Sequence, residues 1–294
     1  MDEKSRKLGL YILFTFVIAW IFQIVASLFA LNGHQSAFSL ILAVSMFVPM
    51  AGALLAGFKL KGMGWIPRFK NKKYIWYIAA FIGPIVFTAL GALLFYVIFP
   101  KTFDPTFTSY MKVSLGQEAV DTLSQQGLTP TTYFWVAVLQ ASTYAPVINM
   151  FFAVGEEAGW RGAMYPVLKE KLGVNKGRLI GGAIWGAWHW PVIILAGYEY
   201  GKEYLGAPFV GPILFLVSAT VLGYLLDYAY DKTKCIWVPA LGHGSFNAIA
   251  GVSMLCLNAE YMNLVTIGPA PVGIVSMIPL IATVVILLVL SRKK

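Results

Sequence analysis

Eight long apolar runs constrain this chain more than any other feature of its sequence. A helix needs about 20 apolar residues to cross the hydrocarbon core of a bilayer, and each run is long enough to form one. The composition agrees, because 59% of the 294 residues are hydrophobic and 12% are charged, whereas soluble domains carry about 25% charged residues. We therefore predict an all-α fold, a polytopic membrane helix bundle with about eight transmembrane helices, forming a single domain over 1–294. The runs cover residues 10–31, 38–58, 75–99, 133–155, 178–197, 209–229, 236–256 and 271–290.

The basic residues predict how this bundle sits in the membrane. If the N-terminus is cytoplasmic, 19 of the 22 Lys and Arg residues fall on the cytoplasmic side, and only Lys101, Lys112 and Lys202 fall outside. This asymmetry follows the positive-inside rule and predicts that both termini are cytoplasmic. It also accounts for the net charge of +9 without a nucleic-acid partner. The first apolar run is too long for a signal peptide and lacks a small-residue cleavage site, so we expect it to be retained.

The polar segment 101–132 is predicted to be an external loop, with a short surface helix over about 115–126 or a lid as alternatives. Cys235 and Cys256 lie at opposite ends of one apolar run. On a helix they would be about 30 Å apart, too far for a disulfide within one chain. We predict neither a disulfide framework nor a thiolate metal site.

Two adjacent acids, Glu156 and Glu157, directly follow the fourth apolar run. A charge at the centre of a membrane helix costs about 2.5–3.5 kcal/mol on insertion scales, so these carboxylates need a partner, a water-filled cavity or a place near the membrane surface. Arg161 follows Glu157 by four residues, and on a helix the two side chains can pair. Asp227, near the end of the sixth run, is interpreted as a boundary residue.

Three further polar side chains lie in later apolar runs. His189 follows the aromatic Trp185 by four residues, and Asn247 follows His243 by four, so each pair can share a helix face. Because ionisable groups inside a membrane are functional candidates by default, we predict that Glu156, His189, His243 and Asn247 converge on one water-accessible cavity.

These residue types suit hydrolysis of an amide bond. A carboxylate can accept a proton from water, and a histidine can orient that water or protonate the leaving amine. A histidine beside an asparagine can donate hydrogen bonds to a developing oxyanion. The sequence has neither a His-Glu-x-x-His zinc motif nor a Gly-x-Ser-x-Gly elbow. Glu156, His189 and His243 could nevertheless ligate zinc, so the predicted cofactor is either none or a divalent metal such as zinc.

The three motifs resemble those of the type II CAAX prenyl protease and bacteriocin-processing (CPBP, ABI) family of intramembrane proteases. The motifs are Glu156-Glu157-x-x-x-Arg161, Trp185-x-x-x-His189 and His243-x-x-x-Asn247, within a predicted catalytic core at 130–255. Typical members of that family have Phe at the position of Trp185.

The resemblance implies a glutamate or metallo-type intramembrane endopeptidase with an eight-helix bundle and a cavity open to the cytoplasm. Glu156 and His189 would activate water, and His243 and Asn247 would form the oxyanion hole. Glu157 and Arg161 would support the site. A membrane-associated or prenylated peptide or protein would be the substrate.

Two other functions remain open at this point. A proton-coupled transporter or channel could use the same buried acids and histidines as a relay, although no second copy of the Glu-Glu motif is present, as an inverted repeat would require. A catalytically silent membrane protein that binds a partner would be expected to lack some of these acids or histidines.

Overall fold

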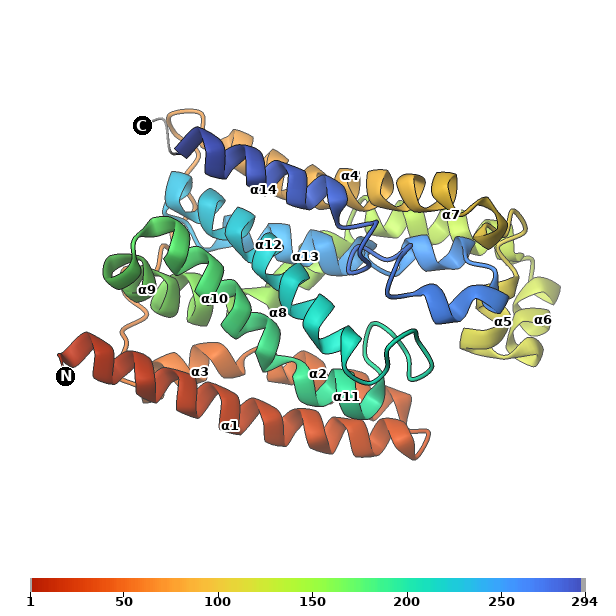
Figure 1. Ribbon diagram of the computed structural model, residues 1–294, viewed down its shortest axis with the longest axis horizontal. Coiled ribbons are helices and arrows are strands. Elements are labelled where there is room, and N and C mark those ends of the chain that lie inside the picture. The colour runs from red at the N-terminus through yellow and green to blue at the C-terminus, as the bar shows by residue number, and fades with distance from the viewer. Residues whose placement is uncertain (1, 292–294) are drawn as a thin grey trace.

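The computed structural model describes residues 2–291 and is built of helices. Apart from one isolated bridge between Phe103 and Leu257, the described residues contain no β-structure. The all-α prediction is therefore confirmed. Figure 1 shows the helices in order: α1 (Glu3–Leu31), α2 (Gln35–Ser45), α3 (Val48–Leu55), α4 (Tyr74–Ile98), α5 (Ser109–Leu115), α6 (Gln117–Gln125), α7 (Pro130–Ala141), α8 (Ala145–Gly159), α9 (Tyr165–Leu172), α10 (Val174–Trp188), α11 (Trp190–Ala196), α12 (Val210–Thr233), α13 (Trp237–Ile249) and α14 (Ile278–Ser291).

Five helical segments among the described residues are long and apolar enough to cross a membrane, or six if the bent segment from α7 to α9 is one span. The five are α1, α2 with α3, α4, α10 with α11, and α12. The predicted number of about eight is not confirmed, because the last two apolar runs form shorter helices. α13 has 13 residues and is therefore only about 20 Å long, less than the ~30 Å of a hydrocarbon core.

Two breaks in the helices have a proline just after them. α7 and α8 are bent by 54° across the break between them, and Pro146 lies in the first turn of α8. Pro191 lies in the first turn of α11, directly after His189 ends α10. A proline is tolerated in a first turn because its missing N–H has no intrahelical partner there. Pro146 therefore begins a helix after the break rather than kinking a continuous one.

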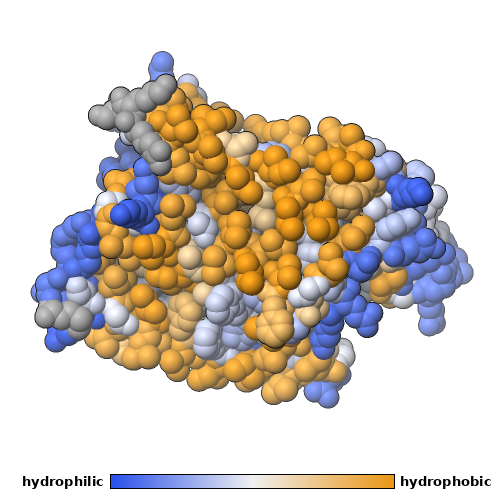
Figure 2. All heavy atoms as spheres, in the orientation of Figure 1, coloured by the Kyte–Doolittle hydropathy of each residue, from blue (hydrophilic) through white to orange (hydrophobic). Residues whose placement is uncertain are grey.

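The two ends of the bundle differ in charge. The start of α1, helix α9 and the end of α14 meet at one end (Figure 1), where Lys4 pairs with Glu170 at 2.6 Å and Asn175 Nδ2 donates to Ser291 Oγ at 3.0 Å. We call this the basic end, because the Lys- and Arg-rich segments gather there. The opposite end carries α5 and α6, so the segment predicted to be an external loop contains short helices. Between the two ends, apolar side chains cover most of the face seen in Figure 2.

A buried ionic network ties α12 to α9 and α10 near the basic end. Asp227 is fully buried and accepts hydrogen bonds from Lys169 Nζ at 2.9 Å and from Arg178 Nε at 2.7 Å. The same two cations contact Asp231, each at 2.8 Å. Asp227, interpreted from the sequence as a boundary residue, lies near the basic end of α12 and is buried there. Its charge is balanced inside the protein, because an unpaired buried carboxylate would be strongly destabilising.

α13 lies in the middle of the bundle, and its residues from Val238 to Phe246 are all buried. Gly244 makes this possible, because a Cβ there would lie 2.5 Å from the backbone nitrogen of Met150 in α8. Gly155 allows a second close approach on the other side of α8, because a Cβ there would lie 2.8 Å from the carbonyl oxygen of Met46. α8 is therefore held closely between α13 and the break that separates α2 from α3.

Candidate active site

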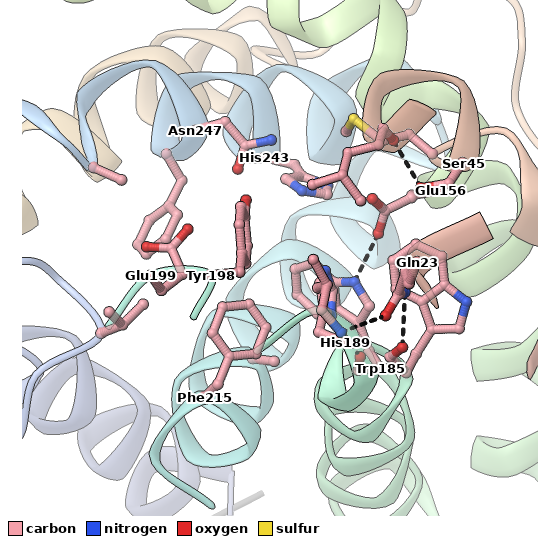
Figure 3. A pocket seen from close by; sticks show the side chains of 18 of the residues that line it. Gln23, Ser45, Glu156, Trp185, His189, Tyr198, Glu199, Phe215, His243 and Asn247 are labelled. Carbon is pink, nitrogen blue, oxygen red and sulfur yellow. Dashed lines mark hydrogen bonds between the residues drawn. The ribbon is translucent and has the colours of Figure 1, made fainter. Parts of the chain in front are cut away.

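One cavity of about 340 Å³ lies inside the bundle and is lined by all four residues predicted to converge: Glu156, His189, His243 and Asn247 (Figure 3). They come from α8, from the break between α10 and α11, and from α13. The rings of His189 and His243 lie 6.3 and 5.1 Å from the ring of Trp185. The two histidines are therefore closer to each other than ~15 Å, a range that two direct contacts and a bridging water can span.

Two tryptophans hold the Glu156 carboxylate. Trp185 Nε1 donates a hydrogen bond to Glu156 Oε2 at 2.7 Å, and Trp160 Nε1 donates to the same oxygen at 3.1 Å. Glu156 is 2% exposed, so these bonds fix its orientation. A phenylalanine in place of Trp185 would lack the N–H that makes the shorter of the two bonds. No hydrogen bond to Oε1 is found among the described residues, which leaves that oxygen for a water or a substrate.

Glu157, the neighbour of Glu156 in α8, contacts a different set of side chains. Arg161 Nη1 donates to Glu157 Oε1 at 2.8 Å, as the four-residue spacing predicts, and His243 Nδ1 lies 2.9 Å from the same oxygen. Glu157 and Arg161 are fully buried, and the guanidinium also lies over the ring of Trp185, 4.6 Å from its centroid. Because a carboxylate only accepts hydrogen bonds, His243 carries its proton on Nδ1 and directs Nε2 elsewhere.

His189 is oriented by backbone rather than by a carboxylate. Its Nδ1 lies 3.1 Å from the carbonyl oxygen of Trp185, so Nδ1 carries the proton and the neutral ring has an unprotonated Nε2. Gln23 of α1 supports the helix break that presents this ring: its Nε2 donates to the Trp188 carbonyl at 2.9 Å, and its Oε1 accepts from Val192 N at 3.3 Å. Gln23 thus satisfies backbone groups next to His189 that the break between α10 and α11 frees.

The cavity is open at one side and closed toward the basic end. Ser39 and Asn247 line it and are exposed, whereas Glu156 and Trp185 line it and are buried. Ser39 lies in the first half of α2 and Asn247 in the last turn of α13, so the mouth lies in the half of the bundle away from the basic end. Beyond Glu156, toward the basic end, Trp160, Arg161 and Tyr165 are fully buried and fill the bundle.

The residues present do not form a ready metal centre. Within residues 2–291, no three His, Cys, Asp or Glu side chains are grouped closely enough to hold a metal ion. Glu156 Oε2 already accepts two indole hydrogen bonds. The set Glu156, His189 and His243 is chemically suited to zinc, but the described structure does not group these three side chains around a metal position.

Sequence reasoning missed three parts of this site. Trp160 could have been found, because it follows Glu156 by four residues, the same spacing that predicted the pairing of Glu157 with Arg161. Gln23 lies in the first apolar run, far from every motif. Glu199, which also lines the cavity, lies in the loop between α11 and α12 and carries no motif.

A helical membrane bundle that encloses a carboxylate, two histidines and an amide around a cavity belongs to the class of polytopic membrane proteins with an intramembrane polar site. Residues 130–249 match the family model described as Type II CAAX prenyl endopeptidase Rce1-like. This match confirms the family resemblance that the three motifs predicted and supports a CAAX-type intramembrane endopeptidase. No curated protein gives a significant match to the chain.

Proposed function

We propose that this protein is an intramembrane endopeptidase that hydrolyses a peptide bond of a membrane-associated or lipidated substrate, with residues 130–255 as its catalytic core within a single membrane domain. The observation that carries the proposal is the position of Glu156, whose Oε2 accepts from Trp160 and Trp185 while Oε1 has no hydrogen-bond partner among the described residues. A fixed carboxylate with one free oxygen, buried beside two histidines, suits a general base.

In the proposed reaction a water molecule binds between Glu156 Oε1 and the unprotonated Nε2 of His189. Glu156 takes one proton from this water as its oxygen attacks the carbonyl carbon of the scissile bond. The resulting oxyanion accepts hydrogen bonds from the Asn247 amide and from His243 Nε2. The proton held by Glu156 then passes to the leaving nitrogen as the C–N bond breaks, which restores the carboxylate.

Glu157 has a positioning part in this scheme. His243 can donate from Nε2 only when both ring nitrogens carry protons, that is, as an imidazolium. The Glu157 carboxylate, 2.9 Å from Nδ1, is placed to pair with that form of the ring, and Arg161 holds Glu157 in position by pairing with it. The three groups together prepare an oxyanion donor before the substrate arrives.

The purified protein is expected to cleave members of a peptide library that carry a lipid anchor faster than the same peptides without one, because the cavity opens inside an apolar bundle.

Activity should persist in excess EDTA, since the three candidate ligands are not grouped around a metal site. Cleavage is followed by mass spectrometry of the products. Activity lost in EDTA and restored by zinc would contradict the metal-free scheme, and absence of cleavage across the library would contradict the endopeptidase.

We also propose that both termini are cytoplasmic and that the cavity mouth faces away from the cytoplasm. The basic end carries most of the Lys and Arg residues, which the positive-inside rule places in the cytoplasm, and the exposed lining residues Ser39 and Asn247 lie in the other half of the bundle. The family resemblance implied a cavity open to the cytoplasm. If the basic end is cytoplasmic, the cavity mouth in the other half of the bundle cannot also be cytoplasmic. We follow the charge distribution and place the mouth on the opposite side of the membrane.

Cysteine labelling of intact cells tests this orientation. Glu118→Cys, in exposed α6, should react with a membrane-impermeant maleimide, whereas Lys70→Cys, at the basic end, should react only after permeabilisation. Cys235 and Cys256 are buried, so the unaltered chain serves as the low-background control. The reverse pattern would place the mouth on the cytoplasmic side and make the substrate a cytoplasmic segment.

A further inference from the structure

Glu199 is a carboxylate in the cavity that the proposed reaction does not use. It lines the cavity on the side opposite Glu156, with Tyr198 beside it (Figure 3). Among residues 2–291, the Glu199 carboxylate forms no ion pair with a basic side chain, and its polar neighbour is the Tyr198 hydroxyl. The carboxylates that are buried most deeply in the described bundle all have partners: Glu156 has two indoles, Glu157 has Arg161, and Asp227 has Lys169 and Arg178.

The loop that carries Glu199 is fixed on both sides of it. Tyr198 N donates to the Val192 carbonyl at 3.3 Å, and Tyr200 Oη donates to the Val272 carbonyl at 3.1 Å. Glu199 itself has a φ of 69°, in the left-handed region that residues with a Cβ adopt only at an energetic cost. The surrounding bonds hold this conformation, so the carboxylate has a defined place in the cavity wall.

The remaining surroundings of Glu199 suit a cation. Within the described part of the chain, no Lys or Arg side chain lines the cavity, so none of these residues supplies a positive charge to Glu199 there. Aromatic rings line the wall next to it: Tyr198 lies 6.4 Å from Phe215, and Phe215 lies 4.6 Å from His189. Rings attract cations through their faces, and a carboxylate adds a charge-assisted hydrogen bond.

We propose that Glu199, together with the rings of Tyr198 and Phe215, forms a subsite that binds a Lys or Arg side chain of the peptide substrate. This inference rests on the proposed endopeptidase function and adds to it a preference for a basic residue near the scissile bond. Burial raises the pKa of Glu199 above its ordinary value. A bound cation would favour the ionised carboxylate again, so binding and ionisation support each other.

The test compares lipid-anchored peptides that differ at one position near the cleavage site, Lys in one and norleucine, its uncharged analogue, in the other. The wild-type protein should show a kcat/KM for the Lys peptide that is higher by roughly tenfold or more, as a charge-assisted hydrogen bond implies. Glu199→Gln should reduce this ratio to near one, mainly through KM. Glu199→Asp, which keeps the charge, should retain part of it.

Glu203→Gln is the matched control. Glu203 lies in the same loop but is exposed and does not line the cavity, so the ratio should be unchanged. An unchanged ratio in Glu199→Gln, or an equal loss in Glu203→Gln, would overturn the subsite. Equilibrium binding of fluorescent Lys and norleucine peptides to Glu156→Gln protein, with and without Glu199→Gln, measures the same preference without cleavage. This arm decides the subsite even if no peptide is hydrolysed, in which case only the endopeptidase proposal fails.

Discussion

Replacing Glu156 by glutamine is expected to lower kcat for peptide hydrolysis by about 10²–10⁴-fold, the range that a positioned general base contributes. Glutamine keeps the size of the side chain, and its carbonyl oxygen can still accept from Trp160 and Trp185, which contact Glu156 at 3.1 and 2.7 Å. It cannot accept a proton from water at neutral pH. KM should change little, because the substrate contacts are otherwise kept. Single-turnover cleavage of a lipid-anchored peptide measures the effect.

Ser245→Ala is the control for this experiment. Ser245 lies between His243 and Asn247 in the sequence, but its hydroxyl donates to the Phe81 carbonyl at 2.6 Å, away from the cavity. Its loss should leave kcat within about twofold, since it removes one hydrogen bond worth roughly 1 kcal/mol of stability and no catalytic group. Normal turnover by Glu156→Gln would show that Glu156 is not the base, and a large kcat loss in Ser245→Ala would point to a serine nucleophile.

Replacing Arg161 by methionine is expected to lower the free energy of unfolding by about 3–5 kcal/mol, because the buried Glu157 would lose its arginine partner and keep only the contact with His243. Both side chains are fully buried, and the guanidinium also contacts the rings of Trp185 and Tyr165 at 4.8 Å or less. The measurement is denaturant unfolding in detergent, followed by tryptophan fluorescence. The large loss is specific to removing the arginine while the buried carboxylate stays.

The double variant Arg161→Met with Glu157→Gln separates this cause from general loss of packing. It should recover much of the stability, since no unpaired charge remains. Lys4→Met, which removes the exposed pair between Lys4 and Glu170, should cost no more than about 1 kcal/mol. A single Arg161→Met variant as stable as the wild type would refute the importance of the buried pair.

The parts of the site that the sequence predicts are those set by helical periodicity. Four-residue spacings brought Glu157 to Arg161 and placed His243 and Asn247 on one face, because neighbours along a helix are determined locally. That the faces of α8, α10 and α13 meet at one cavity was predicted from the cost of polar groups in a membrane, and the structure shows this. The roles of these residues stay predictions.

The parts that the sequence does not predict depend on packing between distant segments. The indole of Trp185 reaches Glu156 from another helix, and Gln23 reaches the break at His189 from α1. Hydropathy alone also overcounts the membrane spans, because a helix surrounded by other helices, such as α13, is apolar without having to cross a bilayer. Glu199 is placed by a loop conformation that no local pattern in the sequence signals.

The filled region between Glu156 and the basic end has a consequence for the membrane itself. A protease needs water at its scissile bond, yet a cell that stores energy as an ion gradient cannot tolerate a conducting path through its membrane. Trp160, Arg161 and Tyr165 are fully buried, and Arg161 is ion-paired with Glu157, so large, fixed side chains occupy this route. The bundle therefore holds a water-accessible cavity that opens on one side and is sealed toward the basic end. Substitutions that enlarge the cavity near its mouth would leave the membrane sealed. Small side chains in place of Trp160, Arg161 or Tyr165 would instead let ions leak across the membrane.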